Sequence, residues 1–163
     1  MESAVVSQGA ELSPDRIYRY RLWRRWGDGT QMTFIGLNPS TADENVDDHT
    51  IRKCIGFAKL HGCDAIEMLN LFALRERNPN LMKKHLEPIG PDNNRFLTKF
   101  AREAKIVVAC WGVHGSFRER SIHVIELFKN KGIKLSCFGM TQRGYPRHPL
   151  LLPYTSQLVE FRG

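Results

Sequence analysis

Short apolar runs alternate with amphipathic segments along most of this chain. The clearest run reads Ile-Val-Val-Ala-Cys-Trp-Gly at 106–112, and its β-branched residues and closing glycine predict a central strand. Similar runs predict further core strands at 31–36, 65–72 and 133–138. Apolar positions at helical spacing predict helices at about 50–61, 92–104 and 118–131. This alternation predicts an α/β fold, a three-layer sandwich around a central, mainly parallel sheet.

The N-terminal part carries a weaker pattern. Residues 17–26 predict a strand of mixed polarity, and Gly-Asp-Gly at 27–29 predicts a turn, so we expect an opening hairpin with the next strand. The N-terminus lacks the basic start and the long apolar stretch of a signal peptide. We therefore interpret residues 1–13 as a flexible tail of the mature protein. Residues 14–163 then form a single domain, since a chain of 163 residues suits one hydrophobic core.

Composition narrows the class of protein. No apolar run is long enough to span a bilayer, so we expect a cytoplasmic protein without a membrane partner. None of the four cysteines forms a C-x-x-C pair, which argues against structural zinc and iron–sulfur clusters. The net charge of +7 favours a polyanionic partner such as nucleic acid, although such a charge also serves solubility.

Polar residues follow several predicted strands at the point where each strand ends. Residues 36–40 read Gly-Leu-Asn-Pro-Ser, Asn70 closes the next strand, and residues 145–150 read Tyr-Pro-Arg-His-Pro-Leu. Ligands of such sheets bind beyond the carboxyl ends of the strands. We therefore expect Asn38 and His148 to meet at one rim of the sheet, where they could polarise a bond. Taken singly, each residue also fits a turn, a cap or a surface loop.

These motifs resemble those of the uracil-DNA glycosylase superfamily. Residues 36–39 match its Gly-x-(Asp/Asn)-Pro motif, and Asn70 matches a strand-end asparagine that reads a pyrimidine edge. His-Pro at 148–149 matches the start of its late His-Pro-Ser-Pro motif. Cys-Trp-Gly at 110–112 is similar to a Leu-Trp-Gly strand end of the uracil-specific family. The order and spacing agree from about residue 34 to residue 152, and the fold implied is glycosylase-like.

The resemblance implies a monofunctional DNA glycosylase, which hydrolyses an N-glycosidic bond and leaves an abasic site. His148 would stabilise negative charge on the departing base, and Asn38 would hold the attacking water, without a metal or an organic cofactor. The implied substrate-binding residues are Gly36, Leu37, Pro39, Ser40, Asn70, Phe72 and Trp111. The implied DNA-binding residues are Arg75, Arg143, Arg147, Leu150, Leu151 and Leu152, with the leucines as a wedge.

The sequence is more closely similar to a small bacterial and phage family of unknown function. The similarity lies in Leu-Asn-Pro-Ser at 37–40 and Pro-Arg-His-Pro-Leu at 146–150, and it brings little chemistry with it. Ser40 stands where uracil-specific glycosylases carry a tyrosine that excludes C5 substituents. We therefore expect the substrate to be DNA that carries a modified, C5-bulky or mismatched pyrimidine. The expected setting is antiphage defence or base-excision repair, and we expect the protein to be a monomer.

Other functions remain open from the residues alone. The basic charge fits a noncatalytic nucleic-acid-binding module. A metal-dependent nuclease is a second alternative, with Asp43, Asp47 and Asp48 as ligands of a magnesium ion. The same acidic residues also suit the capping of the helix that begins near Thr50. A nucleoside hydrolase on the same fold is a third alternative.

Overall fold

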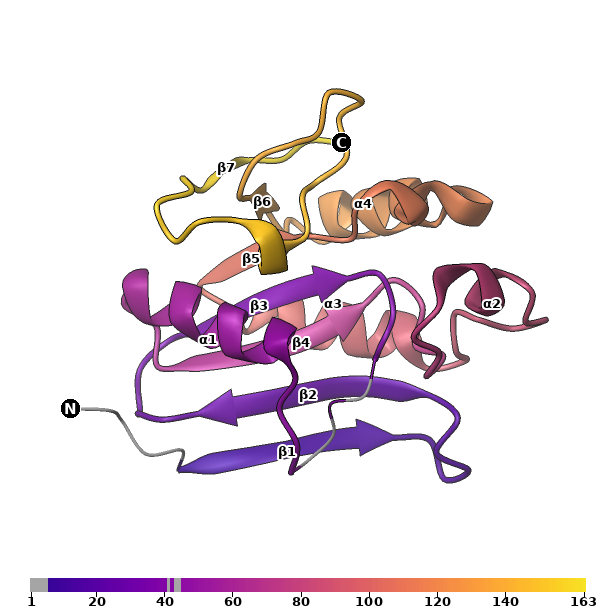
Figure 1. Cartoon of the computed structure of the whole chain (residues 1–163), viewed down its shortest axis with the longest axis horizontal. Helices are drawn as coiled ribbons and strands as arrows, with labels where there is room; N and C mark the ends of the chain where they lie inside the picture. Colours follow the sequence, from indigo (N-terminus) through magenta and orange to yellow (C-terminus); the bar gives the residue numbers. More distant parts are fainter. Residues whose placement is uncertain (1–5, 41, 43–44) are drawn as a thin grey trace.

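The computed structural model describes residues 6–40, 42 and 45–163. Within these residues, one seven-stranded sheet has the order β1-β2-β4-β3-β5-β6-β7 (Figure 1). Its strands are β1 (Ser7–Leu12), β2 (Arg19–Arg25), β3 (Gln31–Gly36), β4 (Ala65–Asn70), β5 (Ile106–Ala109), β6 (Ser136–Cys137) and β7 (Val159–Glu160). The helices are α1 (His49–Leu60), α2 (Pro79–Lys83), α3 (Asn93–Arg102), α4 (Arg120–Asn130), and the 3₁₀ helices η1 (Val113–Glu119) and η2 (Pro149–Leu151).

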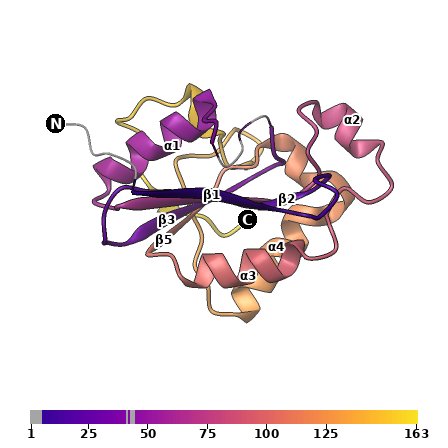
Figure 2. The same ribbon diagram turned by 90° about the horizontal axis from the view of Figure 1, so that it is seen from below.

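The centre of the sheet is parallel. Strand β3 pairs in parallel with β4 and β5, and β5 pairs in parallel with β6, whereas β1, β2 and β7 add antiparallel edges. Helix α1 covers one face, and α3 and α4 cover the other (Figure 2). Each face has its own apolar cluster beneath its helices. This arrangement confirms the predicted α/β three-layer architecture.

Strand β4 lies between β2 and β3, so the predicted hairpin of β2 and β3 is wrong. All six residues of β4 are buried, and Met68 faces Leu22 of β2 on one side and Phe34 of β3 on the other. A strand this apolar is most stable in the interior of the sheet. The predicted turn at 27–29 instead bridges the width of β4, and the N–H of Gly29 donates to Asp64 Oδ2 at 2.8 Å.

The N-terminal segment is a strand where we expected a flexible tail. Residues 7–12 pair antiparallel with β2 as β1, so the tail prediction is wrong for them, and residues 1–5 lie outside the described part. Gly9 makes this pairing fit, because a Cβ on Gly9 would lie 2.3 Å from the indole ring of Trp23. The bare backbone of β1 thus supports a large aromatic ring on β2.

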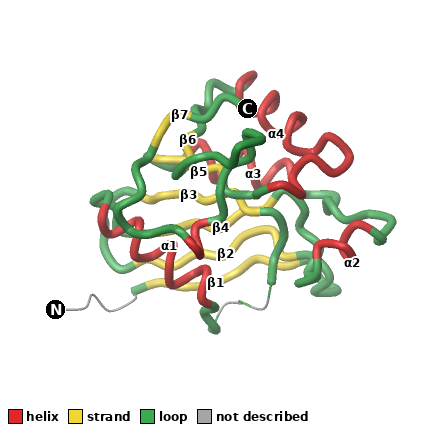
Figure 3. Tube along the Cα trace, turned by 45° about the horizontal axis from the view of Figure 1, so that its top comes forward, coloured by secondary structure: helices red, strands yellow, loops and turns green. Residues whose placement is uncertain are grey.

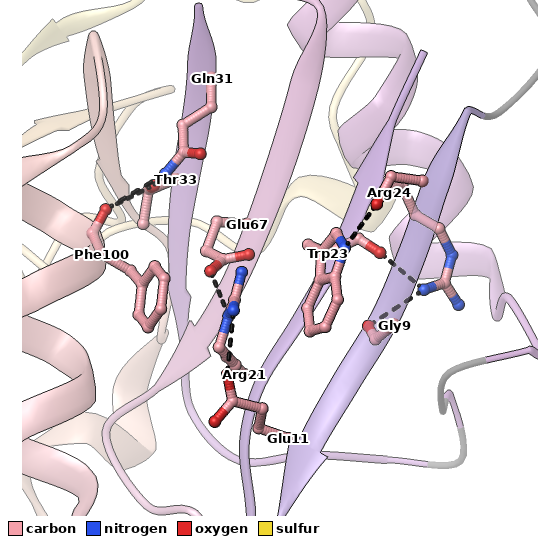
Figure 4. Close-up of polar contacts among 10 residues, drawn as sticks. Gly9, Glu11, Arg21, Trp23, Arg24, Gln31, Thr33, Glu67 and Phe100 are labelled. Atoms are coloured by element: carbon pink, nitrogen blue, oxygen red, sulfur yellow. Dashed lines mark hydrogen bonds and ion pairs between the residues drawn. The ribbon is translucent and has the colours of Figure 1, made fainter.

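Strand β4 also carries a buried carboxyl group on the face covered by α3. Glu67 is 1% exposed, and its Oε1 accepts a hydrogen bond from Arg21 Nε at 2.5 Å (Figure 4). The Arg21 guanidinium stacks 4.0 Å from the ring centre of Trp23 and 3.8 Å from that of Phe100. Burial raises the pKa of Glu67 to about 7, and the hydrogen bond from Arg21 opposes that rise.

The predicted helices appear close to their expected bounds. Asp48 caps α1 by accepting from the N–H of Ile51 at 2.9 Å, as the acidic residues before this helix predict. The last predicted core strand is shorter than expected, because only residues 136–137 pair, and much of the chain around β6 and β7 is loop (Figure 3). No helix in the described residues is long and apolar enough to cross a membrane.

Candidate functional site

The sheet has a switch point between β3 and β5. The chain leaves β3 for β4 on one side and leaves β5 for β6 on the other, so the two exits diverge. Ligands of open α/β sheets bind in the crevice at such a point. A cavity of about 400 Å³ lies there, beyond the carboxyl ends of β3, β4 and β5 and beside the start of α1. The predicted residues that line it are Gly36, Leu37, Asn38, Ser40, Asn70, Trp111 and His148.

Asn38 is held by the main chain of another loop. The segment after β3 stays beside the segment after β4, since the N–H of Phe72 donates to Leu37 O at 2.9 Å. Asn38 then turns, and its Nδ2 donates to the main-chain oxygen of Glu76. This bond fixes the amide and leaves Oδ1 as an acceptor at the cavity wall. An amide oxygen can orient a water molecule, but it cannot remove a proton from it.

Asn70 presents a buried amide to the cavity. The residue is 6% exposed, and its side chain has no hydrogen-bond partner among the residues described. The amide atoms of Asn70 are not among the fully buried, unpaired groups of the described residues, so the amide is accessible from the cavity and suited to a ligand. Gly36 leaves room for this side chain, because a Cβ on Gly36 would lie 2.9 Å from Asn70 Oδ1.

The main chain around Asn70 is fixed from the opposite face of the sheet. Asn93 Nδ2 donates to Asn70 O at 2.9 Å and to Leu71 O at 3.0 Å. Arg120 Nε donates to Leu71 O at 2.8 Å, and burial lowers the pKa of Arg120 to about 10. Neither Asn93 nor Arg120 is singled out by the sequence, because both act across the sheet from other elements.

His148 stands at the mouth of the cavity on the loop before η2. Its Nδ1 accepts from the N–H of Leu150 at 3.2 Å, so the neutral ring carries its proton on Nε2. Partial burial lowers the pKa of His148, and the nearby charge of Asp48 opposes that shift. The Asp48 carboxylate caps α1 and accepts from Ser40 Oγ at 2.5 Å. His148 is therefore suited to donate a hydrogen bond as a neutral imidazole.

His114 is a second histidine in the cavity wall, although the sequence alone suggests a surface or loop residue. It lies on η1, and its Nδ1 is 2.9 Å from Lys83 Nζ on α2. Burial, and then the positive charge of Lys83, lower the pKa of His114. The ring is thus held neutral, with Nε2–H as its donor. Its position two residues after Trp-Gly at a strand end is the only signal of this role in the sequence.

Arg19 reaches the cavity because β2 carries a bulge. Leu12 pairs with Arg19 and Glu11 with Arg21, so Tyr20 is an extra residue on β2. Tyr20 and Arg21 then both pack toward α3, while Arg19 lies on the α1 side and lines the cavity. Strict alternation from Arg21 would place Tyr20 on the α1 side and Arg19 on the α3 side, so the sequence does not reveal the bulge.

The family model for a protein of unknown function (DUF1643) matches residues 19–150. The chain belongs to this family. Neither a curated protein nor a solved structure matches the chain at a significant level. The match runs from the start of β2 into η2, so every residue that lines the cavity lies within the DUF1643 region. The predicted likeness to a small family of unknown function agrees with this match, which carries no activity with it.

Some predicted residues of the DUF1643 region lie away from the cavity. Phe72 is fully buried and packs against Phe117 in the core beneath α3 and α4, so its predicted contact with substrate is wrong. Pro39 is buried and does not line the cavity, and Trp111 lines it with little exposed surface. Leu152 is half-buried against the core beneath α1, which leaves it poorly placed as a wedge.

All but one of the other predicted DNA contacts are exposed in this DUF1643 protein. Leu151 is 91% exposed three residues after His148, and Leu150 is exposed beside it. The loop after β6 carries two exposed arginines, Arg143 and Arg147. Arg75 is half-buried and lines a neighbouring cavity.

The carboxylates of the predicted magnesium site have other partners. Asp47 Oδ1 accepts from Arg24 Nε at 2.7 Å, and both oxygens of Asp48 accept hydrogen bonds. Asp43 lies outside the described residues. Over residues 6–40, 42 and 45–163, no group of three or more His, Cys, Asp or Glu side chains could hold a metal ion.

Proposed function

We propose that this protein is a DNA glycosylase that hydrolyses the N-glycosidic bond of a modified or mismatched pyrimidine nucleotide. The observation that carries the proposal is the cavity at the switch point, which brings together Asn38, Asn70 and His148. The unpaired amide of Asn70 in its wall is suited to the edge of a base. The motif resemblance to uracil-DNA glycosylases supports the same roles.

His148 is the proposed donor to the leaving base. As the glycosidic bond breaks, the base becomes anionic and the sugar cationic, so a donor aimed at a base oxygen stabilises the transition state more than the ground state. A neutral imidazole with its proton on Nε2 can supply such a donor without taking up a proton first. Removal of one donor of this kind typically costs roughly a hundred- to a thousand-fold in rate.

Asn38 and Asn70 are the proposed positioning groups. Asn38 Oδ1 would accept a hydrogen bond from the attacking water, which holds it on the sugar side of the base. Asn70 would donate to and accept from the pyrimidine edge. Because Asn38 is not a base, the chemistry depends on a leaving group that His148 stabilises well.

The cavity wall suggests room for a substituted base. Ser40 occupies the position of the tyrosine that excludes C5 substituents in uracil-specific enzymes, and its hydroxyl is tied to Asp48. A volume of about 400 Å³ lies within the usual range for small-molecule sites. We therefore propose a pyrimidine with a C5 group such as the modified bases of phage DNA, with antiphage defence or repair as the setting.

Release of an abasic site tests the proposal. Purified protein is incubated, with EDTA present, with DNAs containing thymine, uracil, 5-hydroxymethylcytosine or glucosylated pyrimidines. Alkali-labile strand breaks on one substrate are expected, and they should be lost in His148→Ala and greatly reduced in Asn38→Ala. His123→Ala, an exposed change on α4, is the matched control and should keep full activity.

Two results would count against this function. Breaks that EDTA abolishes would favour the metal-dependent nuclease. Tight, salt-dependent binding without breaks on any substrate would favour the noncatalytic binding module, which the net charge of +7 also suits. Unchanged activity in His148→Ala would remove this histidine from the mechanism.

A further inference from the structure

A second cavity of about 500 Å³ adjoins the candidate site, and three arginines line it. They are Arg16, Arg75 and Arg77. Two residues, Ser40 and Arg77, line both cavities, so the second opens beside the first with a shared wall. We call the second cavity the arginine groove. None of its arginines except Arg75 belongs to the residues that the motifs single out.

The fold places these arginines together by extending β2 and β4 beyond their ends. The N–H of Arg19 donates to Ala73 O at 2.9 Å, and the N–H of Arg75 donates to Ile17 O at 2.9 Å. This antiparallel pairing sets Arg75 beside Arg16, where Arg75 Nη1 donates to Arg16 O at 3.4 Å. The groove wall is therefore a paired, ordered segment.

Arg16 has a backbone conformation that residues other than glycine rarely adopt. Its φ is 62°, in the left-handed region, which is unfavourable for a residue with a Cβ. A local turn holds that conformation, since the N–H of Arg16 donates to Ser13 O at 2.8 Å. Strain of this kind is concentrated at functional sites, and here it lies in the wall of the groove.

Two arginines of the groove, Arg75 and Arg77, form no ion pair with any carboxylate that the structure describes. The acidic residue of the groove, Glu76, uses Oε1 to accept from the N–H of Asn78 at 3.2 Å. Arg77 is exposed and Arg75 is half-buried, so both can reach a ligand.

We propose that the arginine groove binds the sugar–phosphate backbone of DNA next to the nucleotide whose base occupies the candidate cavity. Guanidinium groups suit phosphates because their N–H donors form paired hydrogen bonds with phosphate oxygens. Arg77 lines both cavities, so it contacts the phosphate at the junction, and Arg75 contacts the next one along the groove. The place of the flipped nucleotide rests on the proposed function, whereas backbone binding in the groove does not.

Binding measured over a range of salt concentrations tests this surface. The probes are fluorescently labelled single-stranded and duplex oligonucleotides of ordinary bases, followed by anisotropy in sodium chloride. Arg75→Gln/Arg77→Gln should weaken binding on the order of ten-fold at low salt, equally for different sequences. The plot of log affinity against log salt should become shallower by about one for each phosphate that the variant no longer binds.

A control of equal charge separates the groove from general electrostatics. Arg102→Gln/Lys131→Gln removes two positive charges from the α3–α4 face, which is the face of the sheet opposite α1 (Figure 2). It should change affinity much less than the groove variant and leave the salt slope near that of the wild type. If the control weakens binding and the groove variant does not, DNA lies on the α3–α4 face and the proposal is overturned.

Thermal unfolding of each variant guards against a folding defect. If the double variant does not fold, Arg77→Gln alone is used, because this exposed side chain contributes little to the packing of the fold. A salt slope for Arg77→Gln equal to that of the wild type overturns the contact at the junction. If the groove variants lose affinity for DNA while no DNA releases a base, backbone binding in the groove is supported and the proposed glycosylase activity is not. Base release by a protein whose groove variants bind normally overturns the groove and leaves the proposed glycosylase intact.

Discussion

Asn70 Oδ1 lies 2.9 Å from the position that a Cβ on Gly36 would occupy. The two residues are partners in the parallel register of β3 and β4, and both are buried. Leu71 N–H donates to Gly36 O at 2.9 Å, so the two main chains are held together just beyond the pair. A methyl group at residue 36 can therefore be accommodated only if the Asn70 amide turns away or the strands separate.

Gly36→Ala should impair the site more than the stability of the fold. Overpacking of a tight interior typically costs about 1–3 kcal/mol, and a displaced amide no longer reads the base edge. We expect a loss of that size in urea unfolding, together with a loss of base release from whichever DNA proves to be the substrate in the abasic-site assay.

A double-mutant cycle identifies the cause. In an Asn70→Ala background the crowded oxygen is absent, so Gly36→Ala should add little further loss of stability. Equal costs of Gly36→Ala in the two backgrounds would show that the methyl group clashes with something other than the amide.

The sequence predicts most elements but not all of their neighbours. The apolar run at 65–72 predicts a buried strand, yet periodicity reports burial and not which strands lie on either side. The turn at 27–29 is correct, but it spans β4 instead of closing a hairpin. Residues 7–12 read Ser-Gln-Gly-Ala-Glu-Leu, a polar segment whose strand depends on pairing with β2 and on the fit of Gly9 to Trp23.

The site is predicted where its residues directly follow strands. Asn38 and Asn70 meet because parallel strands end at one edge, and their motifs mark those ends. His114 is missed because its partner Lys83 comes from another element. Arg19 is missed because its orientation depends on a bulge in β2. Such residues depend on tertiary contacts that neither spacing nor motif reveals.

The buried carboxyl of Glu67 should make stability depend on pH. Its pKa is raised from 4.5 to about 7, so the folded protein binds a proton more tightly than the unfolded chain. Stability from this group is therefore complete below pH 4.5 and is lost as the pH rises to about 7. A shift of this size corresponds to roughly 3 kcal/mol.

Glu67→Gln isolates this effect. Glutamine stays neutral and keeps an acceptor for Arg21, so the free energy of unfolding of the variant should rise relative to the wild type across this pH range. Urea unfolding of both proteins at several pH values measures the difference. The exposed change Glu119→Gln, just before α4, is the control, and a difference between Glu67→Gln and the wild type that does not vary with pH would contradict the raised pKa.

Lys83 should control the protonation of His114. Part of the lowering of the His114 pKa comes from the Lys83 charge, so Lys83→Met should raise that pKa. Burial, the larger cause, remains, and the pKa should stay below that of an exposed histidine. An NMR titration of the ring protons measures it directly, with Lys83→Arg as the variant that keeps the charge. If Lys83→Met leaves the His114 pKa unchanged, the 2.9 Å contact does not persist in solution.

Leu151 should matter more for base release from duplex DNA than for the stability of the protein. The side chain is 91% exposed at the rim that carries His148, so it contributes little to the core. Leu151→Ala should change the free energy of unfolding by less than about 0.5 kcal/mol. An apolar wedge helps to unstack a base from a duplex, a step that single-stranded DNA hardly needs. We therefore expect a large fall in base release from duplex DNA and a small one from single strands.

Leu86→Ala changes a leucine that is also 91% exposed, on the loop after α2, and it is the control. An equal loss on both substrates would indicate a contact with the base or sugar instead of a wedge.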